Sequence, residues 1–84
     1  MNFTRNLELD LKNDVEVGGK KYLLSTVELP VWLGYKYETM LFAYDGENVN
    51  YLDLYCERYA TKEEATNRHK HLLEKLKAGV KIWK

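Results

Sequence analysis

The sequence has one cysteine and no excess charge of either sign. Cys56 has no second thiol within the chain, so no intrachain disulfide can form and the fold must rest on packing. Lysine plus arginine number 13, as do aspartate plus glutamate, so the formal net charge is +0. Balanced charge removes the long-range attraction of a dedicated nucleic-acid binder and argues against nucleic acid as the main partner.

Long apolar runs are also absent. No stretch approaches the roughly 20 apolar residues of a membrane span. The first residues alternate between apolar and polar instead of forming the apolar core of a signal peptide. We therefore expect a chain without a membrane partner that resides in the cytoplasm, where a lone thiol stays reduced.

The length and composition predict one folded domain over residues 1–84. The chain is 45% hydrophobic and 31% charged, the balance of an ordinary globular protein. A chain of 84 residues is too short to divide into two cores.

Period-2 alternation predicts a first β-hairpin. Apolar residues fall on odd positions from Leu7 to Val17, with acidic residues between them. Gly18-Gly19 has the composition of a two-residue hairpin turn, so Lys20–Leu29 is the second strand. Pro30 ends that strand because proline cannot donate to a sheet ladder.

A second hairpin is expected from Tyr37–Tyr44 and Val49–Tyr59, joined by the turn residues 45–48. If this loop closes simply, three pairs face each other across the strands: Tyr44 with Val49, Phe42 with Tyr51, and Met40 with Asp53.

A helix follows the last strand. Thr61 and Glu64 have the spacing of a capping box, so the helix begins near Lys62, and Gly79 is a natural stop. Its apolar face consists of Ala65, His69, Leu72 and Leu76. Residues 80–83 form either a last short strand or a tail folded over the sheet. The expected fold is α+β, an antiparallel meander of four to five strands with one C-terminal helix on one face.

The helix can bury only one face of this sheet. In the expected register that face carries Thr39, Leu41, Leu52, Leu54 and Cys56. The opposite face carries Met40, Phe42, Tyr44, Val49, Tyr51, Tyr55 and Tyr59. Such an aromatic surface is larger than a monomer usually leaves in water. Three groups could cover this face: the chain's own Trp32 loop and C-terminal tail, a second copy forming a homodimer, or a foreign protein.

The charges are unevenly distributed. Acidic residues predominate up to residue 61 and basic residues after it. On the outside of the helix, Arg68, Lys70 and Lys75 could steer a partner, although a solvated face explains them equally.

No residue pattern specifies catalysis or a metal. His69 and His71 diverge by about 200° on a helix, so they cannot share one ion without another element. Cys56 and His69 both point inward in the expected register, which allows a formal nucleophile pair, but no third orienting residue accompanies them. We expect no cofactor and no enzymatic activity.

Three segments carry a resemblance. They are Glu38–Phe42, Leu52–Tyr59, and Thr61–Ala65 with His69 beyond. Over about residues 22–76 the chain resembles small uncharacterised proteins of bacteriophages and prophages. That resemblance implies an infected bacterial cytoplasm, where such chains bind and disable host proteins, including as anti-CRISPR or other anti-defence inhibitors.

The function expected first is therefore a non-catalytic phage accessory protein that binds a host protein. Its contacts would come from Trp32, Met40, Phe42, Tyr44, Tyr51, Tyr55 and Tyr59, with Arg68, Lys70 and Lys75 steering. An alternative is a dimer that sequesters a nucleotide signal between aromatic walls and helix lysines. A further alternative is a weak nucleic-acid-binding module that uses the basic helix.

Overall fold

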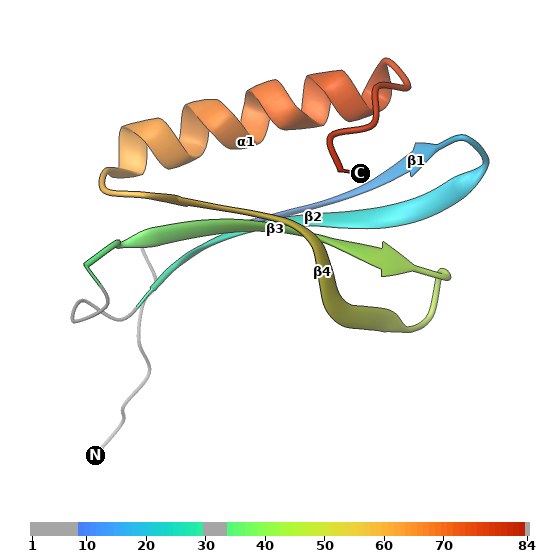
Figure 1. Cartoon of the computed structure of the whole chain (residues 1–84), viewed down its shortest axis with the longest axis horizontal. Coiled ribbons are helices and arrows are strands. Elements are labelled where there is room, and N and C mark those ends of the chain that lie inside the picture. Colours follow the sequence, from blue (N-terminus) through green and yellow to red (C-terminus); the bar gives the residue numbers. More distant parts are fainter. Residues whose placement is uncertain (1–8, 30–33, 84) are drawn as a thin grey trace.

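The computed structural model describes residues 9–29 and 34–83 (Figure 1). Four antiparallel strands form one sheet in the order β1-β2-β3-β4, so each strand pairs with its neighbour in sequence. The elements are β1 (Asp10–Val17), β2 (Lys20–Glu28), β3 (Tyr37–Tyr44), β4 (Val49–Tyr59) and α1 (Lys62–Lys77). The predicted α+β class, a meander with one C-terminal helix, is confirmed.

The first hairpin turns at Gly18-Gly19, as predicted. Both glycines have positive φ, 59° and 81°, which is the backbone of a two-residue turn whose twist matches that of the strands. Val17 pairs with Lys20 across the turn. A side chain at either position would be strained in this left-handed conformation.

α1 begins and ends where the sequence predicts. The Thr61 hydroxyl accepts a hydrogen bond from the Glu64 backbone N–H at 3.2 Å and satisfies one of the free donors of the first turn. At the other end Gly79 has φ 83°, and the Val80 N–H donates to the Lys75 carbonyl at 2.9 Å. The buried face of the helix is the predicted one: Ala65, His69, Leu72 and Leu76.

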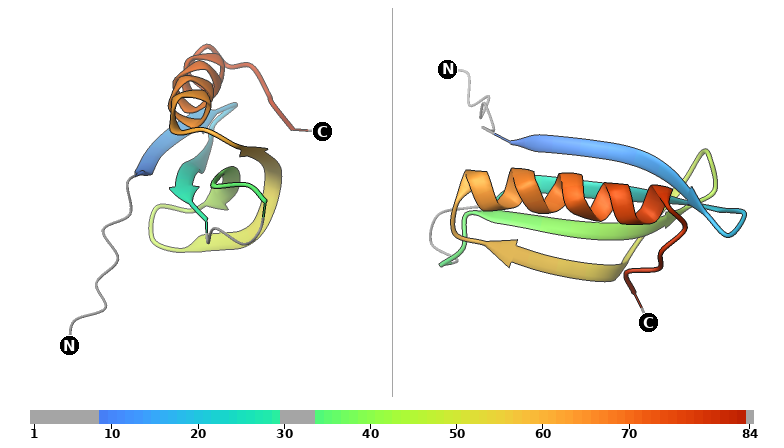
Figure 2. Two further views of the ribbon diagram at one scale, coloured as in Figure 1. Left: turned by 90° about the vertical axis from the view of Figure 1, so that its left-hand side faces the viewer. Right: turned by 90° about the horizontal axis from the view of Figure 1, so that it is seen from above.

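The core lies between α1 and one face of the sheet. Figure 2 shows α1 running along the sheet, in roughly the same direction as the strands, with β1 and β4 at the two edges of the sheet. The main apolar cluster comprises Val15, Val17, Tyr22, Leu24, Leu41, Leu72 and Leu76. A second cluster near the start of α1 comprises Leu9, Tyr37, Tyr59 and Ala65. Burial of the apolar side chains in these two clusters contributes favourably to the free energy of folding.

The pairing of β3 with β4 departs from the simple register. Tyr44 pairs with Val49, as predicted, but Met40 pairs with Cys56 and not with Asp53. A register shift falls between Leu41 and Ala43, so that residues 51–54 of β4 lie opposite Phe42 alone. This bulge bends β4, and its first half turns away from α1 in Figure 1.

The shift moves residues to the other face of the sheet, because side chains alternate along a strand. The prediction that Leu52, Leu54 and Cys56 lie under the helix is wrong, since all three are exposed. Tyr55 and Tyr59 were expected on the open face, by which we mean the face of the sheet that α1 does not cover. They lie on the helix side instead, packed against the two apolar clusters.

Residues 80–83 form a tail, not a fifth strand. Ile82 and Trp83 pack against the main cluster on the helix side. The tail therefore folds over the sheet, but over the face that α1 already covers. Trp32, the other expected cover for the aromatic face, lies outside the described residues.

Candidate functional site

The bulge in β4 presents large apolar side chains to solvent. Leu52 is 77% exposed, Tyr51 74% and Leu54 40%. We call these three residues the β4 patch. Single exposed apolar side chains are common on protein surfaces, but here three fall within four residues of an edge strand. Tyr51 lies beside Phe42, and Leu54 lies toward Tyr22 and Trp83.

The bulge is built by local interactions. The Asn50 side-chain oxygen accepts a hydrogen bond from the Leu52 backbone N–H at 3.1 Å, which supports the bend where ladder pairing stops. The Tyr51 ring lies edge-on to the Phe42 ring with centroids 5.2 Å apart. Phe42 is buried, so Tyr51 is fixed to the sheet at its base while most of its ring faces water.

Backbone geometry makes strand addition a poor use of this edge. β4 is an edge strand and offers unpaired backbone groups along one side. The bulge interrupts the straight row of donors and acceptors that an incoming strand needs. Recognition at the β4 patch must therefore depend on side chains.

The structure divides the predicted contact residues among three places. Met40, Phe42 and Tyr44 lie on the open face of the sheet, and Tyr51 lies beside them at the bulge. Tyr55 and Tyr59 lie on the helix side. Arg68, Lys70 and Lys75 lie on α1, across the sheet from the open face. A single flat surface does not contain all of them.

Tyr59 and Arg68 are engaged in a network around Glu57. Arg68 Nε donates to the Glu57 carboxylate at 2.9 Å, and the Tyr59 hydroxyl donates to it at 2.7 Å. Burial raises the pKa of Glu57, but the bonds from Arg68 and Tyr59 outweigh it and hold this pKa below its ordinary 4.5. These groups join α1 to β4 and are not free to steer a partner.

Cys56 and His69 do not form a nucleophile pair. Cys56 pairs with Met40 on the open face, whereas His69 is buried under α1 on the other side of the sheet. Burial and then the nearby Glu38 carboxylate raise the pKa of the Cys56 thiol. The thiol is 3.6 Å from Glu38, which itself pairs with Arg58 at 2.8 Å.

His69 sits in a buried polar network of uncharged groups. Its Nε2 bonds the Asn13 side-chain oxygen and its Nδ1 bonds the Thr26 hydroxyl, both at 2.7 Å. Thr26 also bonds Thr39 at 2.5 Å. Burial lowers the pKa of His69, so the ring is neutral at pH 7. The network satisfies the polar groups of Thr26, Thr39 and His69 inside the core, and Asn13 joins it from the exposed side of β1.

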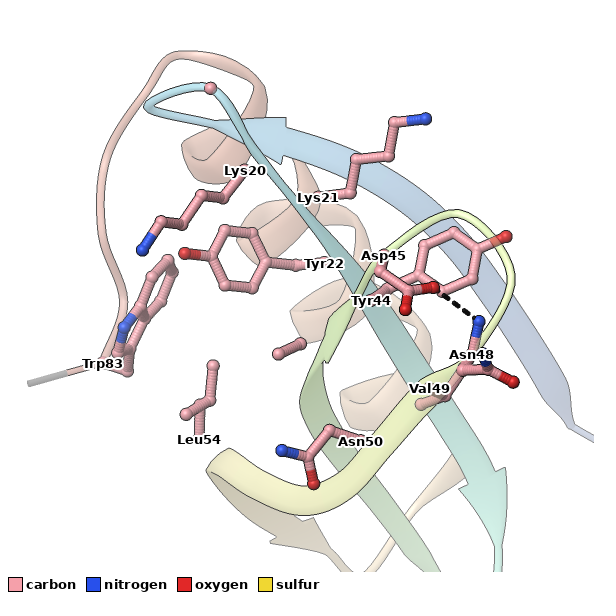
Figure 3. Close-up of a pocket in the computed structure, with 12 residues that line it drawn as sticks. Lys20, Lys21, Tyr22, Tyr44, Asp45, Asn48, Val49, Asn50, Leu54 and Trp83 are labelled. Carbon is pink, nitrogen blue, oxygen red and sulfur yellow. Dashed lines mark hydrogen bonds between the residues drawn. The ribbon is translucent and has the colours of Figure 1, made fainter.

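Sequence reasoning missed a hollow at the turn end of the sheet, drawn in Figure 3. It has a volume of about 790 Å³ and lies between the C-terminal tail and the bent half of β4. Tyr22 and Trp83 form its aromatic side, Leu54 faces them, and the Lys20 ammonium adds positive charge beside them, whereas the Lys21 side chain extends away from the hollow. The sequence did predict the two turns that bound the hollow, one at Gly18-Gly19 and one at residues 45–48. No sequence pattern predicts that Trp83 contacts Tyr22.

Within residues 9–29 and 34–83, no three His, Cys, Asp or Glu side chains gather closely enough to hold a metal ion. In the same part of the chain no helix has the length and apolar character needed to cross a membrane. No model of a protein family matches the chain, and neither a curated protein nor a solved structure matches it.

Proposed function

We propose that this chain is a non-catalytic binding protein that attaches to another protein through the β4 patch and thereby inhibits it. The observation that supports this most is the exposure of Tyr51 and Leu52, 74% and 77%, on a bulge of an edge strand. Bulges are a common means of re-aiming side chains at functional positions.

The exposed side chains leave binding energy unused within the chain. Burying a leucine or aromatic side chain fully is worth roughly 1.5–3 kcal/mol. Tyr51 and Leu52 forgo most of that burial in the isolated chain. A partner with a matching apolar pocket would recover it, and aromatic anchors of this kind dominate the energetics of interfaces.

Charge favours a different protein over a second copy. Asp53 is exposed in the middle of the β4 patch, between Leu52 and Leu54. In a twofold dimer built on this patch, each Asp53 would approach its own counterpart, and like charges at an interface are unfavourable. A partner whose apolar pocket is rimmed by lysine or arginine meets the patch without that repulsion.

The setting of this proposal comes from the resemblance to phage and prophage proteins. The proposed partner is therefore a host protein of the bacterial cytoplasm. The more specific proposal is that the chain acts as an anti-CRISPR or other anti-defence inhibitor. The steering role proposed for Lys70 and Lys75 would act at long range, because both lie on α1 and not beside the patch.

The test is capture of a partner by the purified chain and by two variants. Tyr51→Ser with Leu52→Ser removes the apolar contacts, and we expect at least about tenfold weaker capture of any specific bacterial protein. Tyr35→Ser with Val80→Ser is the matched control, since Tyr35 is 47% and Val80 48% exposed elsewhere on the chain. Capture by the control should equal capture by the unaltered chain.

Light scattering on the purified chain completes this test. The proposal expects a monomer, with the β4 patch free. Equal capture by both variants would contradict the role of the patch. A wild-type dimer that Tyr51→Ser with Leu52→Ser dissociates would show that a second copy, and not a host protein, occupies it.

A further inference from the structure

The hollow at the turn end of the sheet has the dimensions of a small-molecule site. Its volume of about 790 Å³ falls within the roughly 300–1,000 Å³ typical of ligand pockets. In Figure 3 it opens between Trp83 on the tail, Tyr22 on β2, and Leu54 and Asn50 on the bent half of β4. The bulge that exposes the β4 patch therefore also shapes this hollow.

One side of the hollow is aromatic. The Tyr22 and Trp83 rings lie 4.6 Å apart at an interplanar angle of 50°, so they support each other without stacking in parallel. Trp83 also bounds a smaller hollow, and the Lys81 ammonium over its ring, 5.3 Å from the centroid, belongs to that side. Trp83 thus borders both hollows, and its ring contributes to the lining of the larger one.

The charge around the larger hollow is positive. Lys20 and Lys21 both line it, and neither forms an ion pair with any described residue. Asp45 is the one acidic group of the lining, and its carboxylate already accepts the backbone N–H groups of Glu47 and Asn48 at 2.9 and 2.7 Å. The Lys20 ammonium, which lies beside the Tyr22 hydroxyl and Trp83 in Figure 3, is therefore available to an anion, whereas the Lys21 side chain extends away from the hollow.

Polar side chains complete the lining. Asn48 and Asn50 contribute amides that can both donate and accept hydrogen bonds. An aromatic surface, one lysine ammonium and two amides are groups that suit a ring carrying polar edges and an anionic substituent.

We infer that this hollow binds a nucleoside phosphate, with the base against Trp83 and Tyr22 and the phosphate at Lys20. The inference does not rest on the proposed function: the two sites share Leu54, but Tyr51 and Leu52, which the capture test alters, do not line the hollow. Base stacking on an aromatic side chain is worth about 1–3 kcal/mol, and it tolerates different bases. The site should thus recognise the class of ligand more than one particular base.

Tryptophan fluorescence tests this directly. The chain has two tryptophans, so a Trp32→Phe background leaves Trp83 as the only reporter. Titration with AMP should change the Trp83 fluorescence saturably, and adenosine and inorganic phosphate should each bind at least about tenfold more weakly. Lys20→Gln should weaken AMP binding by about tenfold, whereas Lys62→Gln, at the start of α1, should leave it unchanged.

A second measurement on the unaltered chain guards against loss of folding in the Trp32→Phe background. AMP should shift the backbone amide NMR signals of residues 20–22, 48–50 and 83. Three results would overturn the inference: no saturable change up to about 5 mM AMP, equal affinity in Lys20→Gln, or phosphate binding as tight as AMP binding. The capture test above uses Leu52 and Tyr51, so either proposal can fail without the other.

Discussion

Replacing His69 with leucine should lower the free energy of unfolding by about 1–2 kcal/mol, a sizeable share of the roughly 4–13 kcal/mol expected for a domain of this size. Leucine fills most of the space of the ring but offers no hydrogen bond. It leaves the Thr26 hydroxyl, which is fully buried, without its His69 partner, whereas Asn13 is exposed and can bond water instead. Each buried polar group left unpaired costs about 1–3 kcal/mol.

The geometry also assigns the protons in this network. Asn13 Oδ1 can only accept, so the neutral ring carries its proton on Nε2 and donates it there. Nδ1 then accepts from the Thr26 hydroxyl, which in turn accepts from the Thr39 hydroxyl. His69→Leu removes the link that orders these three side chains.

His71→Leu is the matched control for this prediction. His71 lies two residues further along α1 and is exposed, so its loss should change stability by less than about 0.5 kcal/mol. Urea unfolding followed by circular dichroism measures both variants. Equal losses in the two variants, or a loss below about 0.5 kcal/mol for His69→Leu, would refute a stabilising role for the network.

The same histidine should make the fold sensitive to mild acid. Burial lowers the pKa of His69 in the folded chain below its ordinary value of 6.5, which applies in the unfolded chain. As the pH falls through 6.5, the unfolded state therefore binds the proton first and gains stability relative to the folded state. Stability is fully present above 6.5 and decreases by at most about 1.4 kcal/mol per pH unit below it.

Unfolding in urea at pH 7.5, 6.5 and 5.5 measures this dependence. His69→Leu should flatten it, because the group that titrates is gone. Glu57 does not interfere, since its pKa is held below 4.5, under the pH range used. An unchanged slope in His69→Leu would assign the acid sensitivity to other groups.

Local signals in the sequence predicted most of the fold. The Gly18-Gly19 turn, the Thr61 cap and the buried face of α1 each depend on residues close together in the chain. Their geometry follows from steric limits on φ and from the helical period, which hold wherever the segment lies. The alternation in β1 and β2 was equally informative because those strands pair without interruption.

The register of β4 could not be predicted in the same way. Alternation assigns faces only while pairing is continuous, and the bulge opposite Phe42 adds residues to one strand alone. Every residue from Tyr51 to Tyr59 was therefore at risk of assignment to the wrong face. One signal was present: Asn50 is a residue that strands disfavour, and its side chain caps the bend.

The two candidate sites differ in how far the sequence reveals them. Tyr51 was expected at an interface, but Leu52 and Leu54 were assigned to the core, so the β4 patch emerged only with the bulge. The hollow at the turn end of the sheet brings Tyr22 to Trp83, which lie far apart in the sequence. Such a long-range contact depends on the path of the tail, which no local pattern encodes.

Site-specific photocrosslinking in bacterial cells tests most directly whether the β4 patch contacts another protein. A photoreactive residue placed at position 52 should give a crosslinked product with one protein other than this chain. The same residue at position 35, also exposed, should give none. Absence of a product at position 52, or identical products at both positions, would contradict the claim.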